Sequence, residues 1–143
     1  MSKYTELAME RRKQMTPEGR PAWNCCQAVV SVFAGDAGYD EAACMKAATY
    51  FRGGMQQGYV CGAVTGGMLA LGLAGVEDPK AANELIRRVK ERHEGMINCR
   101  DLLKANAEKG GEKMPHCNAM IRKRIGKAKE TLTKTKEDLP WRW

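Results

Sequence analysis

The chain has 143 residues, of which 43% are hydrophobic and only 6% are aromatic, and it carries a net charge of +7. Alanine and methionine outnumber valine and isoleucine, and long alternating runs of β-branched residues are absent, which argues against a sheet. A chain of this length can bury enough apolar surface to fold without crosslinks. We therefore predict an all-α fold, a single domain over residues 1–143 built as a bundle of about six or seven helices around a glycine-rich central helix.

Apolar periodicity and capping residues divide the chain into helices joined by glycine- and proline-containing loops. Asn24, Asp40 and Asp78 each precede a predicted helix, and we expect them to be N-caps, while Asn98 precedes a shorter helix. Pro79 would then lie in the first turn of its helix, which is typical of a helix start. The predicted helices are residues 4–15, 25–34, 41–51, 60–74, a segment that begins at Pro79, 99–109, and 115–136 before a loose tail.

The segment 60–74 is the most apolar part of the chain. Its length is marginal for a membrane span, and glycine-rich apolar segments of this size are more often core helices when the rest of the chain is charged. We therefore expect no membrane span. The first residues are polar and charged and show no signal-peptide pattern, so we also expect a cytoplasmic protein.

The C-terminal part, about residues 122–143, is predicted to be a basic helix and tail. Seven lysine and arginine residues lie between Arg122 and Lys136. Such a run could follow the phosphates of a nucleic acid, but no aromatic side chains are interleaved for stacking on bases. We favour a solvated helix face and do not expect nucleic acid as a partner.

The six cysteines are the main indication of function. Cytosolic thiols stay reduced, so cysteines there are more often metal-binding or redox-active than part of a disulfide framework. No pair has CxxC spacing, and no CxxCH motif for covalent haem occurs. A P-loop, a dinucleotide-binding fingerprint and the HExxH metal motif are also absent from the sequence.

Four of the cysteines, Cys25, Cys61, Cys99 and Cys117, share a position in the first turn of a predicted helix. Free backbone N–H groups and the positive end of the helix dipole stabilise a thiolate there, which prepares the sulfur as a nucleophile or a metal ligand. We interpret the four as one joint site. A buried free cysteine can instead be a small hydrophobic residue, and we assign Cys44 to the core on this ground.

Three glycines follow Cys61 in the stretch CGAVTGG, and each weakens a helix by about 1 kcal/mol relative to alanine. Gly62 and Gly66 lie on one helix face, so a neighbouring helix or a sulfur-bound centre can approach the backbone there. Backbone N–H groups could then bond to sulfur, and we include both glycines among the candidate cofactor-binding residues. Cys26 points about a quarter-turn away from Cys25 and is core, a spare thiol or an alternate metal ligand.

We do not assign the two histidines or the methionines to the predicted cysteine site. His116 adjoins Cys117 and could act as a base or a ligand, but we expect a surface histidine near a helix start. His93 lies in the charged stretch RRVKERHE and is expected to face solvent. The nine methionines are expected to be flexible core residues rather than copper(I) ligands.

Several stretches together resemble a known family: NCCQAV at 24–29, CGAVTGG at 61–67, INCRDLL at 97–103 and the later Cys117. They are similar to the family of redox-active proteins named for its C, GCAxxG, C, C pattern. The resemblance spans Trp23 to Ile121, implies a redox core over about residues 22–121, and places the family's four cysteines on the four named above, with Cys26 as an addition. A similar segment in split-Soret-type cytochromes is associated with an iron–sulfur centre, which implies iron binding by four thiolates.

Three functions agree with these observations. The first is electron transfer to a redox partner protein through an iron–sulfur cluster, most simply [2Fe–2S], held by Cys25, Cys61, Cys99 and Cys117. The second is a thiol–disulfide or sulfur-handling oxidoreductase, with Cys61 as the attacking thiol because the glycines leave it approachable. The third is a redox-inert module, with zinc or no metal, whose basic helix binds an acidic partner. The helix starts could come from one chain or from two, which leaves a homodimer open.

Overall fold

The computed structural model describes residues 2–138, and their side chains as far as Thr131. Within that range the regular structure is helical, which confirms the all-α prediction, and the predicted tail at 139–143 lies outside the described residues. Two short helical turns, η1 and η2, separate the third and fourth α-helices. The elements are α1 (Lys3–Arg12), α2 (Cys25–Ala34), α3 (Glu41–Ala47), η1 (Thr49–Phe51), η2 (Gly54–Gly58), α4 (Gly62–Leu73), α5 (Pro79–Arg92), α6 (Cys99–Glu108) and α7 (Lys113–Asp138).

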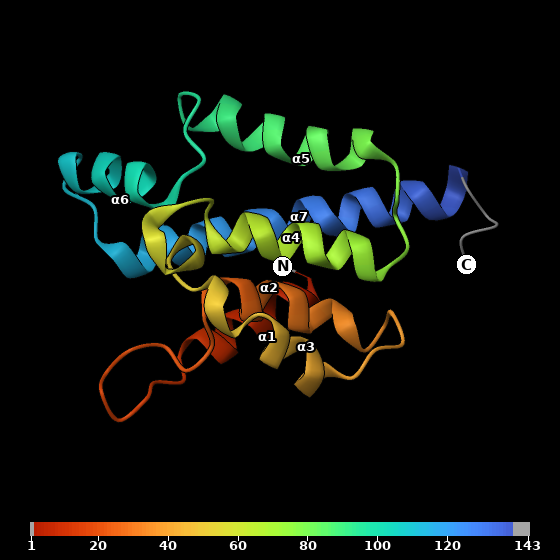
Figure 1. Cartoon of the computed structure of the whole chain (residues 1–143), viewed down its shortest axis with the longest axis horizontal. Coiled ribbons are helices and arrows are strands. Elements are labelled where there is room, and N and C mark those ends of the chain that lie inside the picture. The colour runs from red at the N-terminus through yellow and green to blue at the C-terminus, as the bar shows by residue number, and fades with distance from the viewer. Residues whose placement is uncertain (1, 139–143) are drawn as a thin grey trace.

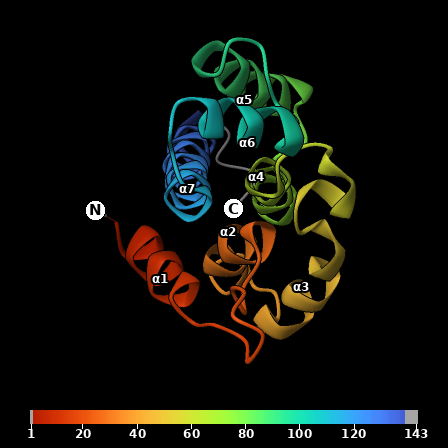
Figure 2. The same cartoon turned by 90° about the vertical axis from the view of Figure 1, so that its left-hand side faces the viewer.

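The helices are arranged in three layers (Figure 1). Helices α4 and α7 run side by side through the middle, with α1, α2 and α3 on one side and α5 and α6 on the other, as the end-on view in Figure 2 also shows. Helices α2, α4 and α7 all pack against one another. These three helices point the same way, so their first turns gather at one end of the bundle, on the left in Figure 1.

The main core lies between the central layer and its two neighbours. Apolar side chains from α2, α4, α5, α6 and α7 meet there, among them Val29, Val64, Leu85, Leu102 and Ile121, all of them buried. Burial of each such side chain contributes about 1.5–3 kcal/mol. Among the helices of residues 2–138, none combines the length and the apolar character that a membrane crossing needs.

Glycines on α4 allow α2 to pack unusually close to it. A Cβ atom added at Gly66 would lie 2.8 Å from the Cβ of Val29 and 2.9 Å from the carbonyl oxygen of Cys26. At Gly62 the added atom would lie 2.7 Å from the carbonyl oxygen of Phe51. Polypeptide therefore lies close against both glycines, as expected of a neighbouring helix, and the role of Gly62 and Gly66 beside a sulfur-bound centre stays a prediction.

Helix α7 begins two residues earlier than the predicted start at Pro115. Its first residue is Lys113, which places Pro115 in the first turn and Cys117 in the second. Proline is tolerated in the first turn because the N–H that it lacks would have no partner within the helix. The prediction that Cys117 occupies a first turn is therefore wrong.

Candidate functional site

Cys25, Cys61, Cys99 and Cys117 line one small cavity at the end of the bundle where α2, α4, α6 and α7 begin. We call this the inner cavity. It has a volume of about 10 Å³, and it is closed by Gly62, Leu102, Leu103, His116 and Met120. The fold thus gathers the four cysteines that the sequence placed far apart. Their joint role in one chemistry remains a prediction.

The start of α2 is fixed by Asn24, which is 1% exposed. The Asn24 side chain accepts a hydrogen bond from the backbone N–H of Gln27, and the Gln27 side chain accepts one from the backbone N–H of Asn24, so the two form a capping box. The Asn24 amide also donates to the carbonyl oxygens of Ala48 and Thr49. Asn24 therefore holds Cys25, the first residue of α2, against the segment that follows α3.

Cys61 and Cys99 are held together by a short backbone pairing that the sequence did not reveal. Val60 and Asn98 form an isolated antiparallel bridge, in which the N–H of Cys61 donates to Ile97 and the N–H of Cys99 donates to Tyr59, at 3.0 and 2.7 Å. The bridge joins the residue before each cysteine. It therefore brings the starts of α4 and α6, and their sulfur atoms, to the same cavity.

Cys25 and Cys117 are direct neighbours, and their thiol groups are hydrogen-bonded. Because the Cys117 S–H donates to it, the pKa of Cys25 is lowered to about 6. The same bond and burial raise the pKa of Cys117. The lowered pKa of Cys25 and the raised pKa of Cys117 make Cys25 the better nucleophile of the pair and Cys117 its hydrogen-bond donor.

Cys61 differs from Cys25 because it is the N-cap of α4 and only 7% exposed. Burial raises its pKa to about 11, and the charge of Cys25 contributes to this. Desolvation here outweighs the backbone N–H groups of Ala63 and Val64, which lower the pKa. Burial and a raised pKa count against Cys61 as the attacking thiol, a role that stays a prediction, and Cys25 has the lower pKa of the two.

Arg12 supplies positive charge to the cysteine pair and was missed in the sequence. It is 4% exposed, and its guanidinium donates to Asn118, to the carbonyl of Trp23 and to the sulfur of Met114. All three acceptors are neutral, so its charge is not cancelled by a carboxylate at these contacts. Arg12 lowers the pKa of both Cys25 and Cys117. Nothing in the sequence marks this arginine among its neighbours on α1.

A larger opening, the outer cavity, leads to the same cysteine pair. It has a volume of about 330 Å³, and Cys25 and Cys117 lie in its wall together with Asn24 and Met114. Of the residues whose side chains the structure describes, four cationic ones also line it and no acidic one does: Arg12, Arg20, Arg52 and Lys113. A small molecule can therefore reach the pair from this side, and positive charge favours an anionic one.

The other two cysteines lie away from both cavities. Cys26 is fully buried in a second core cluster with Val30 and Ala48, and burial raises its pKa to about 12. Of the three roles predicted for Cys26, the structure therefore favours that of a core residue. Cys44 sits on α3, a helix with no buried residue, so its assignment to the core was wrong.

The histidines are nearer to the site than the sequence suggested. His116 lines the inner cavity, and its ring lies 6.4 Å from the ring of His93. Burial lowers the pKa of both, which keeps both neutral at pH 7. The prediction that His93 faces solvent is wrong, because its Nε2 atom is buried without a hydrogen-bond partner among the described residues.

The inner cavity fits a metal centre in chemistry but not in space. Four thiols are the donor set that iron–sulfur clusters and structural zinc use. Within the described part of the chain, however, no group of three or more His, Cys, Asp or Glu side chains is placed to hold a metal ion. A volume of about 10 Å³ is near the lower limit for one water molecule. A cluster would require these thiols to move apart.

One protein-family model matches the chain over most of its length. Residues 23–131 match the family model described as "Putative redox-active protein (C_GCAxxG_C_C)". The chain belongs to this family. This confirms the resemblance to the family seen in the sequence. Searches of curated proteins and of solved structures found no significant match.

Proposed function

We propose that this member of the redox-active C_GCAxxG_C_C family works by thiol–disulfide exchange, with Cys25 and Cys117 as its reactive pair. The observation that carries the proposal is that these two cysteines lie side by side in the wall of a cavity of about 330 Å³. Redox pairs need two sulfur atoms that can bond to each other and a path for the substrate. Cys25 and Cys117 have both.

The two cysteines carry out different steps of the reaction. The Cys25 thiolate attacks one sulfur of a substrate disulfide, forms a mixed disulfide and releases the first substrate thiolate. Cys117 then loses its proton to the second leaving sulfur and attacks Cys25, which closes the Cys25–Cys117 disulfide. Two electrons pass from the protein to the substrate, whose two halves leave as one thiolate and one thiol. A redox partner protein that supplies two electrons would restore the dithiol.

The charge of the outer cavity indicates the class of substrate. Arg12, Arg20, Arg52 and Lys113 surround the approach to Cys25. We infer that the substrate disulfide carries carboxylates or other anionic groups. A dianionic aromatic disulfide such as 5,5′-dithiobis(2-nitrobenzoate) should react faster than a neutral disulfide of similar leaving-group pKa, and the advantage should fall with added salt.

The second candidate is an iron–sulfur cluster held by the four cysteines for one-electron transfer. The observation that favours it is that all four thiols line the inner cavity and that no carboxylate from the described side chains does. Zinc in the same place would give a redox-inert protein. Bound to four thiolates, a cluster would supply one-electron redox chemistry, with Cys25, Cys61, Cys99 and Cys117 as the residues that hold it.

One preparation distinguishes these functions. The full-length protein is purified anaerobically, and its visible spectrum and its iron, sulfide and zinc contents are measured on the same sample. Stoichiometric iron and sulfide would overturn the thiol proposal in favour of a cluster. A colourless, metal-free protein that forms a Cys25–Cys117 disulfide with mild oxidant, mapped by mass spectrometry, would support it. A disulfide between Cys61 and Cys99 instead would identify these two cysteines as the reactive pair and overturn the assignment of Cys25 and Cys117.

A further inference from the structure

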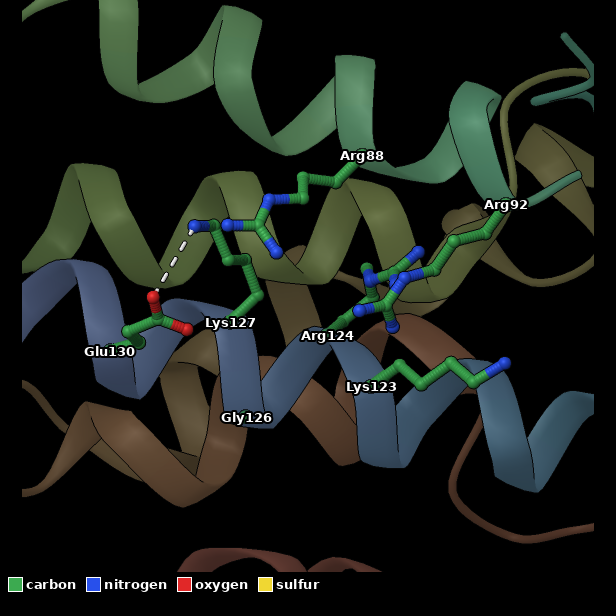
Figure 3. A pocket seen from close by; sticks show the side chains of 7 residues that line it. All are labelled: Arg88, Arg92, Lys123, Arg124, Gly126, Lys127 and Glu130. Carbon is green, nitrogen blue, oxygen red and sulfur yellow. Dashed lines mark ion pairs between the residues drawn. The ribbon is translucent and has the colours of Figure 1, made fainter.

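A second basic cavity lies between α5 and α7, apart from the cysteines. It has a volume of about 330 Å³, and we call it the α5–α7 cavity (Figure 3). It shares no lining residue with either the inner or the outer cavity. Its lining holds five cationic side chains and one acidic one: Arg88 and Arg92 from α5, and Lys123, Arg124, Lys127 and Glu130 from α7, with Gly126.

The acidic residues near this cavity neutralise only part of the charge. Glu84 pairs with Arg88 at 3.2 Å, and Glu130 lies 3.8 Å from Lys127. For Arg92, Lys123 and Arg124 the side chains described, those of residues 2–131, provide no carboxylate partner. Like charges gathered in this way repel each other, so the arrangement is best explained by an anion between them.

Arg124 is the strongest sign that an anion belongs there. It is 2% exposed, yet its Nε and Nη1 atoms are buried without any hydrogen-bond partner in the described residues. A buried donor without a partner costs about 1–3 kcal/mol, and more when it is charged. In Figure 3 the guanidinium groups of Arg92 and Arg124 reach toward each other from the two helices. Burial lowers the pKa of Arg124, and the charge of Arg92 adds to this.

The shape of the cavity selects a small ligand. Arg124 lines a cavity of about 330 Å³, so a compact group can enter it and approach this side chain. Among the side chains of residues 2–131, no aromatic one lines the cavity, so these residues offer no surface on which bases could stack. Gly126 faces open space, because a Cβ there would meet no atom within 4 Å. Arginine forks match the oxygen pairs of phosphate groups.

We propose that the α5–α7 cavity binds a small phosphate-bearing molecule, with its phosphate oxygens between Arg92, Lys123 and Arg124. The proposal does not depend on the redox function, because it rests on different residues. Arg92 and Lys123 act at the mouth of the cavity and Arg124 at its base. A diphosphate group fits the surplus of three unpaired cations better than a single phosphate does.

Isothermal titration of the full-length protein with sodium pyrophosphate, at low ionic strength and without divalent cations, tests this. We expect saturable binding of one anion per chain, weaker binding of orthophosphate, and a loss of affinity with added chloride. Arg92→Gln should weaken pyrophosphate binding by about tenfold or more, as expected for a charge-assisted hydrogen bond. Lys123→Gln should also weaken pyrophosphate binding.

Lys90→Gln is the matched control for Arg92→Gln. Both residues are exposed on the last turns of α5 and carry one charge, but Lys90 does not line the cavity. Equal losses in the two variants would show an effect of net charge alone and overturn the proposal. Absence of binding at millimolar pyrophosphate would do the same. Tighter binding of a phosphate-free polyglutamate peptide would reassign the surface to an acidic protein partner, also against the proposal.

Discussion

Cys117, in the second turn of α7, donates its thiol hydrogen to Cys25 at the first residue of α2. This bond, more than the helix start alone, lowers the pKa of Cys25, because Cys61 at the start of α4 and Cys99 at the start of α6 both have raised pKa values. Desolvation opposes the helix dipole at each of these positions. A partner that donates to the thiolate decides which cysteine is reactive.

The first prediction concerns the pH dependence of cysteine reactivity. The alkylation of Cys25 by iodoacetamide should follow a titration with a midpoint near pH 6, since its pKa is about 6. Below that pH the thiol is protonated and the rate falls, because the thiolate is the nucleophile. Peptide mass spectrometry after short labelling measures each site. Cys61, with a pKa of about 11, should react slowly and accelerate up to pH 9. Equal profiles at the two sites would refute the assignment.

The second prediction removes the thiol donor. Cys117→Ala should raise the midpoint of the Cys25 titration by about one pH unit or more, because the thiolate loses its main hydrogen bond. Cys117→Ser keeps an O–H donor and should shift the midpoint less. The absorbance of the thiolate at 240 nm against pH measures both. An unchanged midpoint in Cys117→Ala would show that Arg12 and the helix start suffice without this bond.

The third prediction tests the packing of α4 on α2. Gly66→Ala should lower the free energy of unfolding by about 1–3 kcal/mol, because overpacking forces α2 away, and the new Cβ would lie 2.9 Å from the Cys26 carbonyl oxygen. Gly72→Ala on the same helix is the control, since a Cβ there meets nothing within 4 Å. It should stabilise the protein by up to about 1 kcal/mol through helix propensity. Urea unfolding gives both values, and similar effects of the two variants would contradict the close approach.

The fourth prediction compares the two asparagines that precede a cysteine. Asn24→Ala should destabilise the protein by about 2–3 kcal/mol, because it removes an N-cap and leaves two backbone carbonyl oxygens without their donor. Asn98→Ala should cost less than about 0.5 kcal/mol, since its side chain makes no capping bond. Thermal unfolding of both variants measures the difference. Equal losses would mean that the contacts of Asn24 beyond α2 contribute little.

The sequence also predicted a metal centre and a partner, and both stay predictions. The donor set for a cluster was readable from four cysteines at the starts of apolar-periodic segments. The sequence could not show whether the site has enough space for a cluster, because that space depends on how far apart four separate helices hold their sulfur atoms. A homodimer, a redox partner protein and a cytoplasmic location likewise remain predictions.

The sequence by itself determined the helical class, the caps Asn24 and Asp78 and the placement of Cys25, Cys61 and Cys99 at helix starts, whereas the expected cap Asp40 makes no side-chain capping bond. These are local properties, since periodicity, caps and glycine spacing act over a few residues. Only the tertiary structure decided that the pKa of Cys25 is lowered, with a contribution from Arg12, and that the pKa of Cys61 is raised. It also decided that Arg124 is buried without a partner. The physical reason is the same in each case: desolvation and hydrogen bonding depend on which distant side chains fill the space, and no local pattern encodes that.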